Sequence, residues 1–467
     1  MTLEAFLAIL REQPLVVSVQ ASPGSAADDT DTLLRLAQAS LGQGVHVLRL
    51  EGAERVARIR AATGAPVIGL IKRFAPDSPI YITPTKTEVD ALLATGCEAI
   101  ALDATVRQSE LRGLVERIHR GGALAMGDCD GVESALYAIE AGVDLIGTTL
   151  AGYTETRPHS HGPDLALLRE IARKTRVPIL AEGRYGARWQ VEAALRIGAA
   201  GVVVGGAIND PVKTTRALLP SPRRSGTVGA VDIGGTWLRF AVFSPDWDLL
   251  EVERIHLPPT KAEREAWIKE QLRRHEVCAL GVSTGGVVDP ATGEVWTAKE
   301  YLLPDHIGSR FDEATYGLPT RALDDGLATA WGHACLPDFA GRRVATLAVG
   351  TGVGCGFVAD GQIWMGPRGE YSHINDMPIM GGKTCEEVLA GRVLGPEAPD
   401  EAKALAEQAL RISVQIIRTM WFPDDVVIGG AVGLASWMQP TVQELGLRVS
   451  PFGGDAGLFG AAALALF

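Results

Sequence analysis

Short apolar runs return about every 25 residues between residues 14 and 207, and each ends in polar residues or glycine. Segments with the Leu, Ala and Ile spacing of helices lie between them, for example 29–40, 86–95, 131–141, 165–174 and 188–197. This alternation is typical of parallel βα units. The eight predicted strands span residues 15–20, 45–50, 66–72, 98–103, 123–129, 144–150, 178–183 and 201–207.

Eight such strands with their helices predict a (β/α)₈ barrel, or TIM barrel, over residues 1–219. Residues 220–226 concentrate proline, glycine, serine and arginine without periodicity, and this composition predicts a linker. A new α/β pattern follows in residues 227–467. It has strands at 228–233, 238–243 and 249–255 and a helix at 262–275, and it restarts at 278–283 and 346–358. We therefore expect a second domain with a duplicated fold and a cleft between two lobes.

Composition limits the possible partners of these 467 residues. A formal net charge of −12 and a calculated pI near 5.3 disfavour binding to nucleic acid or to an anionic membrane surface. The six cysteines form no Cys-x-x-Cys pair, as expected for thiols in a reducing compartment. The chain has neither a leader-like start nor a run of eighteen apolar residues, so we expect a cytoplasmic protein.

The residues that close the barrel strands carry the candidate chemistry, because barrel enzymes place reactive groups at the C-terminal ends of strands. A single lysine or aspartate at such a position is more often a solvated surface group. Here a whole set of polar residues and glycines is expected to converge on one rim: Gln20, Arg49, Lys72, Asp103, Asp128, Thr148, Thr149, Glu182, Gly205 and Gly206.

Lys72 and Glu182 would lie across the barrel mouth from each other, as a pair able to move a proton on carbon. A lysine acts as a base near neutrality only when burial or a neighbouring cation lowers its pKa, and Arg49 and Arg73 could supply that positive field. Gly183 and the Gly205-Gly206 turn follow strands 7 and 8, where barrels commonly bind phosphate. The predicted ligand is a phosphorylated small molecule.

Six segments at these strand ends resemble the N-acetylmannosamine-6-phosphate 2-epimerase family: Val-Ser-Val-Gln-Ala21, Pro-Val-Ile-Gly-Leu-Ile-Lys-Arg73, Ala-Leu-Asp-Ala-Thr105, Ile-Gly-Thr-Thr-Leu-Ala-Gly-Tyr-Thr154, Ala-Glu-Gly183 and Val-Val-Gly-Gly-Ala-Ile208. The resemblance implies inversion at C2 of an amino sugar without a redox cofactor. It implies that Lys72 and Glu182 handle the C2 proton and that Gln20, Arg49 and Asp128 hold the sugar.

The chain departs from this family after the Gly-Gly turn. The family usually has an arginine there that contacts phosphate, whereas this chain has Asn209-Asp210. A carboxylate beside a phosphate is repulsive unless it points away. Arg184, on the facing loop, is the expected substitute.

Three glycine turns after apolar strands predict a nucleotide-binding second domain. Each alone is more often an ordinary tight turn, but together they match the phosphate and adenosine loops of a two-lobed kinase. Asp232 in the first turn would hold Mg²⁺ through water. The expected ATP-binding residues are Asp232, Gly234, Gly235, Thr236, Gly350, Thr351, Gly352, Gly354, Gly429 and Gly430.

Asp325 is the candidate general base, because it follows a strand and could accept the proton of a sugar hydroxyl. Its neighbour Asp324 is the competing candidate. Either one could instead be a plain N-cap of the helix that begins near Gly326. The second carboxylate could also raise the pKa of the first.

The second half resembles the sugar kinases of the repressor, ORF and kinase (ROK) family, especially N-acetylmannosamine kinase, over residues 227–467. The likeness rests on Asp-Ile-Gly-Gly-Thr236, Gly-Val-Ser-Thr-Gly-Gly286, Asp325, Gly-Thr-Gly-Val-Gly354, Gly-Glu-Tyr-Ser-His373, Ile-Gly-Gly430 and Asp-Ala-Gly-Leu-Phe-Gly460. It implies an actin-like, ribonuclease H-like ATPase fold that uses ATP and Mg²⁺. It further implies phosphorylation of the sugar at O6 and sugar contacts from Glu370, His373 and Glu386.

Two departures from the ROK pattern bear on activity. The family's cysteine-rich zinc loop is replaced by Met377-Pro-Ile-Met-Gly-Gly-Lys-Thr-Cys385, and one thiol with one imidazole cannot fill a four-ligand structural site, so we expect no zinc. Trp237 also replaces a common lysine after the first glycine turn, and Asp324 replaces a usual asparagine.

Together the halves predict consecutive steps of amino-sugar or sialic-acid catabolism on one cytoplasmic chain, with small-molecule sugars as partners and a homodimer by analogy alone. Two alternatives stay open for the second half: a kinase for another hexose such as glucose or N-acetylglucosamine, or a sugar-sensing domain without catalysis. A sugar-responsive repressor is disfavoured, because an acidic barrel occupies the place of its basic DNA-binding segment.

Overall fold

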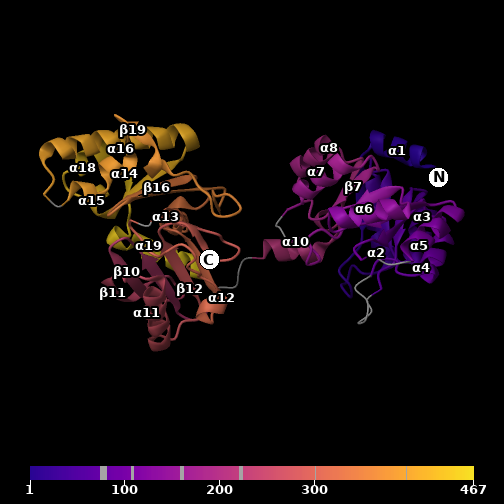
Figure 1. Cartoon of the computed structure of the whole chain (residues 1–467), viewed down its shortest axis with the longest axis horizontal. Helices are drawn as coiled ribbons and strands as arrows, with labels where there is room; N and C mark the ends of the chain where they lie inside the picture. The colour runs from indigo at the N-terminus through magenta and orange to yellow at the C-terminus, as the bar shows by residue number, and fades with distance from the viewer. Residues whose placement is uncertain (74–80, 107–109, 158–161, 220–223, 300, 396) are drawn as a thin grey trace. The chain divides into compact units, whose positions relative to one another are not determined.

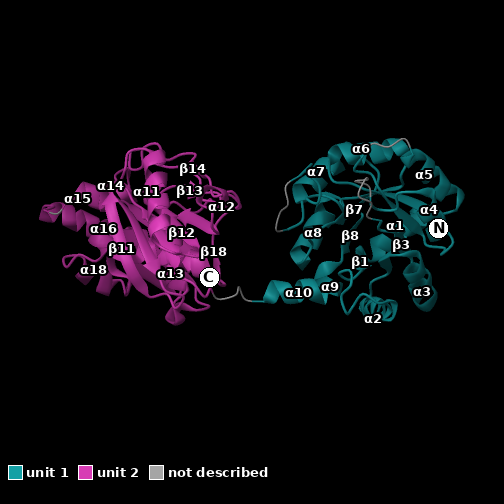
Figure 2. Cartoon of the chain, turned by 90° about the horizontal axis from the view of Figure 1, so that it is seen from below, with its two compact units in different colours: residues 1–220 teal, residues 221–467 magenta. Residues whose placement is uncertain are grey.

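The computed structural model describes residues 1–73, 81–106, 110–157, 162–219, 224–299, 301–395 and 397–467. The chain divides into two compact units, residues 1–220 and 221–467 (Figure 2). Residues 220–223 of the expected linker lie outside the described residues. Each unit is described by itself.

Unit 1 is a closed barrel of eight parallel strands ringed by helices, as predicted (Figure 2). The strands follow chain order around the barrel, and β8 pairs with β1. They are β1 Leu15–Val19, β2 Val47–Glu51, β3 Val67–Leu70, β4 Ala99–Asp103, β5 Leu124–Asp128, β6 Leu145–Gly147, β7 Ile179–Glu182 and β8 Gly201–Val204. The helices are α1 Leu3–Glu12, α2 Thr30–Leu41, α3 Ala53–Thr63, α4 Lys86–Leu93, α5 Leu111–Arg120, α6 Val132–Ala141, α7 Leu165–Lys174, α8 Arg188–Ile197, α9 Gly206–Asn209 and α10 Pro211–Leu218.

Alternation along the strands divides the barrel core into two layers. Leu48 and Leu50 of β2 pack outward with the surrounding helices, whereas Val47 belongs to the cluster inside the barrel. Phe6 and Leu10 of α1 join that inner cluster, and a Cβ on Gly201, the first residue of β8, would lie 3.3 Å from Leu10 Cδ2. Helix α1 therefore covers the N-terminal end of the barrel and leaves the C-terminal end for chemistry.

Unit 2 has two five-stranded mixed sheets of matching topology, ordered β11-β10-β9-β12-β15 and β18-β17-β16-β21-β22. In each, an antiparallel hairpin is extended by a parallel strand from the other side. The first comprises β9 Val228–Ile233, β10 Trp237–Phe243, β11 Leu249–His256, β12 Leu280–Thr284 and β15 Thr320–Asp324. The second comprises β16 Val344–Val349, β17 Val353–Ala359, β18 Gln362–Ile363, β21 Asp425–Gly429 and β22 Arg448–Val449. This duplication is the actin-like fold predicted from the sequence.

Helices and short strands complete unit 2. The helices are α11 Lys261–Arg274, α12 Glu313–Tyr316, α13 Asp325–Ala334, α14 Cys385–Leu389, α15 Gly391–Leu394, α16 Asp400–Trp421, α17 Gly430–Gly433, α18 Gln439–Glu444 and α19 Ala456–Leu466. Two small hairpins pair β13 Val287–Val288 with β14 Val295–Thr297 and β19 Pro378–Met380 with β20 Lys383–Thr384. The run predicted at 346–358 is thus two strands, β16 and β17, separated by the turn at Gly350–Gly352.

Helices α13 and α19 lie between the two sheets and contact each other closely (Figure 1). Glycines make this approach possible: a Cβ on Gly332 would lie 2.9 Å from Gly460 Cα, and one on Gly460 would lie 2.3 Å from Ala328 O. The crossing fixes the N-terminus of α13, where Asp325 lies, between the sheets. Among the described residues no helix is both long and apolar enough to cross a membrane.

Candidate active sites

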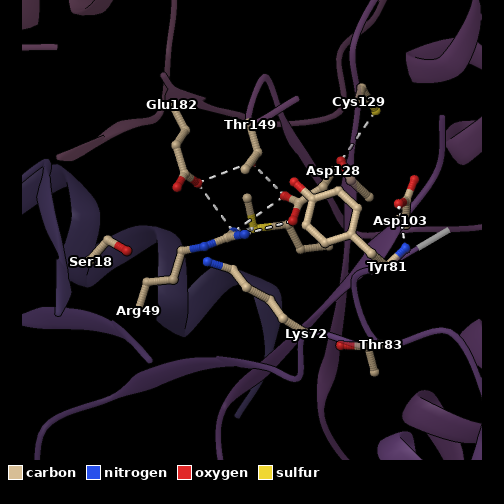
Figure 3. A network of polar contacts seen from close by, with 12 residues as sticks. Ser18, Arg49, Lys72, Tyr81, Thr83, Asp103, Asp128, Cys129, Thr149 and Glu182 are labelled. Atoms are coloured by element: carbon tan, nitrogen blue, oxygen red, sulfur yellow. Dashed lines mark hydrogen bonds and ion pairs between the residues drawn. The ribbon is translucent and has the colours of Figure 1, made fainter. Parts of the chain in front are cut away.

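A buried ion network fills the C-terminal end of the barrel (Figure 3). Arg49 lies inside β2 rather than at its end, and its side chain is 1 % exposed. Its Nη2 lies 2.6 Å from Asp128 Oδ2, and its Nη1 lies 3.3 Å from Glu182 Oε2. Thr149 Oγ1 bonds to both carboxylates, at 2.6 Å from Asp128 and 3.0 Å from Glu182. The predicted rim residues thus converge, with Arg49 one layer deeper than expected.

Lys72 approaches this network from the side opposite Glu182 (Figure 3). Its Nζ donates to Gln20 Oε1 at 2.7 Å, and Gln20 Nε2 donates to Ser18 Oγ at 2.9 Å. Burial and the positive charge of Arg49 lower the pKa of Lys72. The expected second cation, Arg73, instead pairs with Glu88 at 2.7 Å. The positive field on Lys72 therefore comes chiefly from Arg49, with a smaller contribution from Lys213, rather than from Arg73.

The pKa of Glu182 is shifted in the opposite sense. Its withdrawal from water raises the pKa above the ordinary value, against the lowering effect of Arg49. The residue closes β7, where Thr148 Oγ1 donates to its carbonyl at 2.8 Å and accepts from its amide at 2.9 Å. A base with a lowered pKa and an acid with a raised pKa thus lie on two sides of the Arg49 guanidinium, which suits proton transfer near neutral pH.

The residues predicted to bind phosphate are arranged differently from our expectation. Gly183 has φ +113°, which only glycine readily adopts, and Gly205 and Gly206 connect β8 to α9. Arg184 uses its guanidinium to hold the neighbouring loop: Nη1 donates to Ala151 O at 2.6 Å and Nε to Gly162 O at 2.9 Å. The role of Arg184 as the phosphate cation therefore stays a prediction that these contacts do not support.

Tyr81 is a neighbour of this site that the sequence did not reveal (Figure 3). Its amide donates to Asp103 Oδ2 at 3.2 Å, and burial followed by the charges of Asp128 and Asp103 raises its pKa to about 12. It lies just after the predicted third strand, in a segment without helical or strand periodicity, so no pattern marked it. Residues 74–80, which precede it, lie outside the described residues.

The second site is a cleft of about 790 Å³ between the two sheets of unit 2. The three glycine turns predicted for ATP converge on it. Of the predicted residues, those lining the cleft are Asp232, Gly234, Gly235, Thr236, Gly350, Thr351, Gly352, Gly354 and Gly430. Gly429 is not among the lining residues, because it is the last residue of β21 and is buried in the sheet.

The two neighbouring aspartates have separate tasks. Asp324 caps α13, because its Oδ1 accepts from Gly326 N at 2.9 Å, and it is also hydrogen bonded to Tyr371. Asp325 is the first residue of α13 and lines the cleft, where a Cβ on Gly354 would lie 3.2 Å from its Oδ1. Burial and then the charge of Asp232 raise the pKa of Asp325 to about 6. The N-cap explanation thus applies to Asp324. Both aspartates line the cleft, so Asp325 as the base stays a prediction with Asp324 as the competing candidate.

Asp232 is already engaged in this structure. It forms an ion pair with Arg239, whose Nε lies 3.0 Å from its Oδ2, and Ser283 Oγ donates to its Oδ1 at 3.0 Å. Arg239 was not singled out from the sequence. Arg239 lies directly opposite Asp232 in the antiparallel pairing of β10 with β9. The Mg²⁺ role of Asp232 stays a prediction.

Glu386 is the best supported of the three predicted sugar residues. It is 3 % exposed and lines the cleft, where Lys299 Nζ, Arg392 Nη2 and Asn375 Nδ2 donate to it at 2.5, 2.8 and 3.1 Å. Burial by itself would raise its pKa, but these three donors hold it below the ordinary value. The carboxylate is therefore an ionised acceptor held in one orientation.

The other two predicted sugar residues differ in position. His373 lines the cleft, and its Nδ1 lies 3.7 Å from Asp376 Oδ2. Glu370 does not line it: the side chain is exposed, and its Oε2 accepts from Arg368 N at 2.8 Å within the same turn. The sugar contact of Glu370 therefore stays a prediction, and in this structure its own loop holds the carboxylate.

Only part of the metal chemistry fits the residues present. Cys385 is buried against Ser413 Oγ at 3.1 Å, and the one group of three candidate ligands within the described ranges is Glu251 and Glu253 of β11 with His275 at the end of α11. Mg²⁺ fits better, because Asp232 and Asp325 are two oxygen ligands in one cleft and the charge of the first raises the pKa of the second.

Comparisons with known proteins match both units. Residues 33–219 match the family described as "Putative N-acetylmannosamine-6-phosphate epimerase", and residues 228–390 match the ROK family. The barrel is 38 % identical to the solved N-acetylmannosamine-6-phosphate 2-epimerase from Clostridium perfringens, covering 46 % of this chain and 94 % of that one with a TM-score of 0.44. A ROK family glucokinase from Streptomyces griseus, solved with glucose and AMPPNP, is 21 % identical over 51 % of this chain and 99 % of its own, with a TM-score of 0.43.

One comparison covers both units together. The bifunctional enzyme NanE/NanK of Brucella melitensis biotype 1 is 32 % identical over 503 aligned positions, which include 97 % of this chain and 96 % of that enzyme. The order of the two halves is thus the same, and an epimerase barrel precedes a ROK kinase domain in both. The chain belongs to the family of bifunctional NanE/NanK enzymes.

Proposed function

We propose that the kinase half transfers the γ-phosphate of ATP to O6 of N-acetylmannosamine, and that the barrel converts N-acetylmannosamine 6-phosphate to N-acetylglucosamine 6-phosphate. The barrel carries the stronger support: Lys72 and Glu182 approach the buried Arg49–Asp128 pair from opposite sides. The order of the steps follows from their chemistry, because the product of the kinase is the substrate of the epimerase.

Inversion at C2 requires removal of a proton from one face of the carbon and its return to the other. In the open-chain sugar this proton lies beside the C1 carbonyl, so the negative charge moves to O1 as the proton leaves. Lys72, with its lowered pKa, is the candidate base, and Glu182, with its raised pKa, is the candidate acid. Arg49 lies between them and would stabilise the charge on O1. No redox cofactor is required.

In the cleft, Asp325 would accept the proton of the attacking hydroxyl as the hydroxyl oxygen bonds to the γ-phosphorus of ATP and the bond from that phosphorus to the departing ADP breaks. Glu386 and His373 would orient the sugar, and the turns at Gly234–Thr236 and Gly350–Gly354 would hold the triphosphate. Mg²⁺ bound near Asp232 and Asp325 would neutralise phosphate charge.

The test of both steps is one incubation in D₂O with ATP, Mg²⁺ and N-acetylmannosamine, followed by NMR. We expect a 6-phosphate and then deuterium at C2 in both epimers. Lys72→Met should stop deuterium incorporation while phosphorylation continues, and Lys174→Met, an exposed lysine on α7, should change neither. Absence of any 6-phosphate in the parent protein would refute the kinase assignment, and absence of deuterium when N-acetylmannosamine 6-phosphate is supplied would refute the epimerase.

A second candidate for unit 2 is a sugar-binding domain without catalysis. The Asp232–Arg239 ion pair favours it, because the guanidinium occupies the carboxylate assigned to Mg²⁺. Phosphorylation assays across N-acetylmannosamine, N-acetylglucosamine and glucose separate the alternatives: transfer to one sugar identifies the substrate, whereas sugar binding without transfer to any of them supports the sensor.

A further inference from the structure

The turn after β8 replaces the expected cationic residue with a carboxylate, but the carboxylate faces inward. Asp210 is 3 % exposed and caps α10: its Oδ1 accepts from Lys213 N at 3.1 Å, and its Oδ2 accepts from Ser22 Oγ at 2.9 Å. Burial opposes ionisation, yet these hydrogen bonds keep the pKa of Asp210 below its ordinary value. Its negative charge is therefore fixed and directed away from solvent.

This buried carboxylate positions Lys213. Lys213 Nζ lies 3.5 Å from Asp210 Oδ2, and a Cβ on Gly206 would lie 3.2 Å from Lys213 Cδ and 3.7 Å from its Nζ. The ammonium thus lies directly over the Gly205-Gly206 turn. Its side chain is 67 % exposed, so the same group also faces solvent and can receive a ligand.

The Lys213 ammonium is also coupled to the reaction centre. Asn209, which precedes Asp210, donates through Nδ2 to Ser18 O at 3.1 Å, and this contact ties the turn to β1. Ser18 Oγ in turn accepts a hydrogen bond from Gln20 Nε2, and Gln20 Oε1 accepts one from Lys72 Nζ. The charge of Lys213 accordingly contributes to the lowered pKa of Lys72. A group bound at Lys213 would therefore lie within electrostatic range of the proposed base.

We propose that Lys213, held by Asp210, binds the phosphate of the sugar phosphate and makes the barrel select phosphorylated over free sugar. The proposal rests on the epimerase function proposed above. Lys213 thus supplies the positive charge about one helical turn after residues 209–210, where the related epimerases usually have an arginine. It also explains why a carboxylate is tolerated at residue 210, because Asp210 orients the lysine and does not face the ligand.

The test compares Lys213→Met with the parent on N-acetylmannosamine 6-phosphate and on N-acetylmannosamine. We expect KM for the phosphorylated sugar to rise about 10- to 100-fold, as for the loss of one charge-assisted contact. The loss of the Lys213 charge should also lower kcat, by a smaller factor, because that charge helps to lower the pKa of Lys72. Any exchange on the free sugar should fall only by this smaller factor, because the free sugar has no phosphate contact to lose. Competitive inhibition by inorganic phosphate should weaken by a similar factor. Lys213→Arg should keep most of the parent's affinity.

Arg216→Met is the matched control, because Arg216 lies one turn further along α10 and is exposed. It should leave KM unchanged. An unchanged KM and unchanged phosphate inhibition in Lys213→Met would overturn the proposal while leaving the epimerase function intact. A parent protein without C2 exchange would refute the epimerase function instead. Lys213 would then be tested separately, by comparing how much inorganic phosphate raises the melting temperature of the parent and of Lys213→Met.

Discussion

Replacing Asp325 with Asn should stabilise unit 2 while abolishing its kinase activity. The pKa of Asp325 is 3.8 in an unfolded chain and about 6 in the fold, because burial and the charge of Asp232 disfavour its ionised form. The difference of about two pKa units, at about 1.4 kcal/mol per unit, means that ionised Asp325 lowers the free energy of unfolding by at most about 3 kcal/mol. An amide of the same shape does not carry this penalty.

The pH window follows from the direction of the shift. Below pH 3.8 the carboxyl is protonated in both states, so it imposes no penalty. Between pH 3.8 and about 6 the folded state binds the proton more tightly than the unfolded chain, and stability falls as the pH rises. Above about pH 6 both states are ionised and the whole penalty is present. The gain from Asp325→Asn should therefore grow across this window and then become constant.

Tryptophan fluorescence during denaturant unfolding can measure this gain, because eight of the nine tryptophans lie in unit 2. Kinase turnover in the variant should fall by at least about 100-fold. Asp400→Asn, a fully exposed carboxylate at the start of α16, should change neither stability nor turnover. The prediction is wrong if the gain in stability over the parent is the same at pH 5 and at pH 8, or if the variant keeps the parent's turnover.

Three further substitutions test other parts of the fold. Arg49→Met should destabilise the barrel by about 3–5 kcal/mol, because it leaves the carboxylates of Asp128 and Glu182 buried without their cation; calorimetry of the full chain measures the loss. Gly460→Ala should destabilise unit 2 by about 1–3 kcal/mol and lower kinase turnover, because its methyl group would meet a backbone oxygen of α13. Lys299→Met should raise the KM of the kinase for sugar about tenfold, because Glu386 loses a donor that orients it.

Each of these substitutions has a control at a comparable residue. Arg188 is 92 % exposed, and Arg188→Met should shift stability by less than about 0.5 kcal/mol. Gly454 has open space around it, so Gly454→Ala should leave stability unchanged. Lys383→Met should leave KM unchanged, because Lys383 is exposed and does not line the cleft. Equal effects in a test variant and its control would contradict the corresponding prediction.

Periodicity predicted the fold well because both units repeat a simple element. All eight barrel strands lie within the predicted ranges or overlap them closely, and β9 matches its predicted bounds of 228–233. The shortest barrel strand, β6, ends at Gly147 rather than at residue 150, because Thr148 and Thr149 turn toward Glu182. The early end of β6 depends on hydrogen bonds to Glu182 of β7, so the local sequence pattern does not predict it.

The positions of the candidate residues were more predictable than their partners. Residue type and place after a strand selected Lys72, Glu182 and Asp325, and the structure places the first two beside Arg49 and the third in the cleft. The ion-pair partners of Asp232 and Glu386 could not be selected in this way. Arg239 and Lys299 occur at strand and loop positions where a charged side chain is normally exposed to solvent. The hydrogen bond between the Arg368 amide and Glu370 was not predicted either, because the sequence motif does not show how the turn folds. Ion pairs between separate elements depend on tertiary geometry, which a single sequence does not encode locally.

The glycine crossing of α13 and α19 has a consequence for how the kinase cleft could close. Interlocked side chains resist sliding between packed helices, but here Gly332 faces Gly460 backbone to backbone. Rotation about this point would cost little repacking and would move the Asp232 turn relative to the Gly350–Gly354 turn, which belong to opposite sheets. The crossing thus gives unit 2 a pivot next to its proposed base, so that lobe closure would change the surroundings of Asp325 while its helix stays intact.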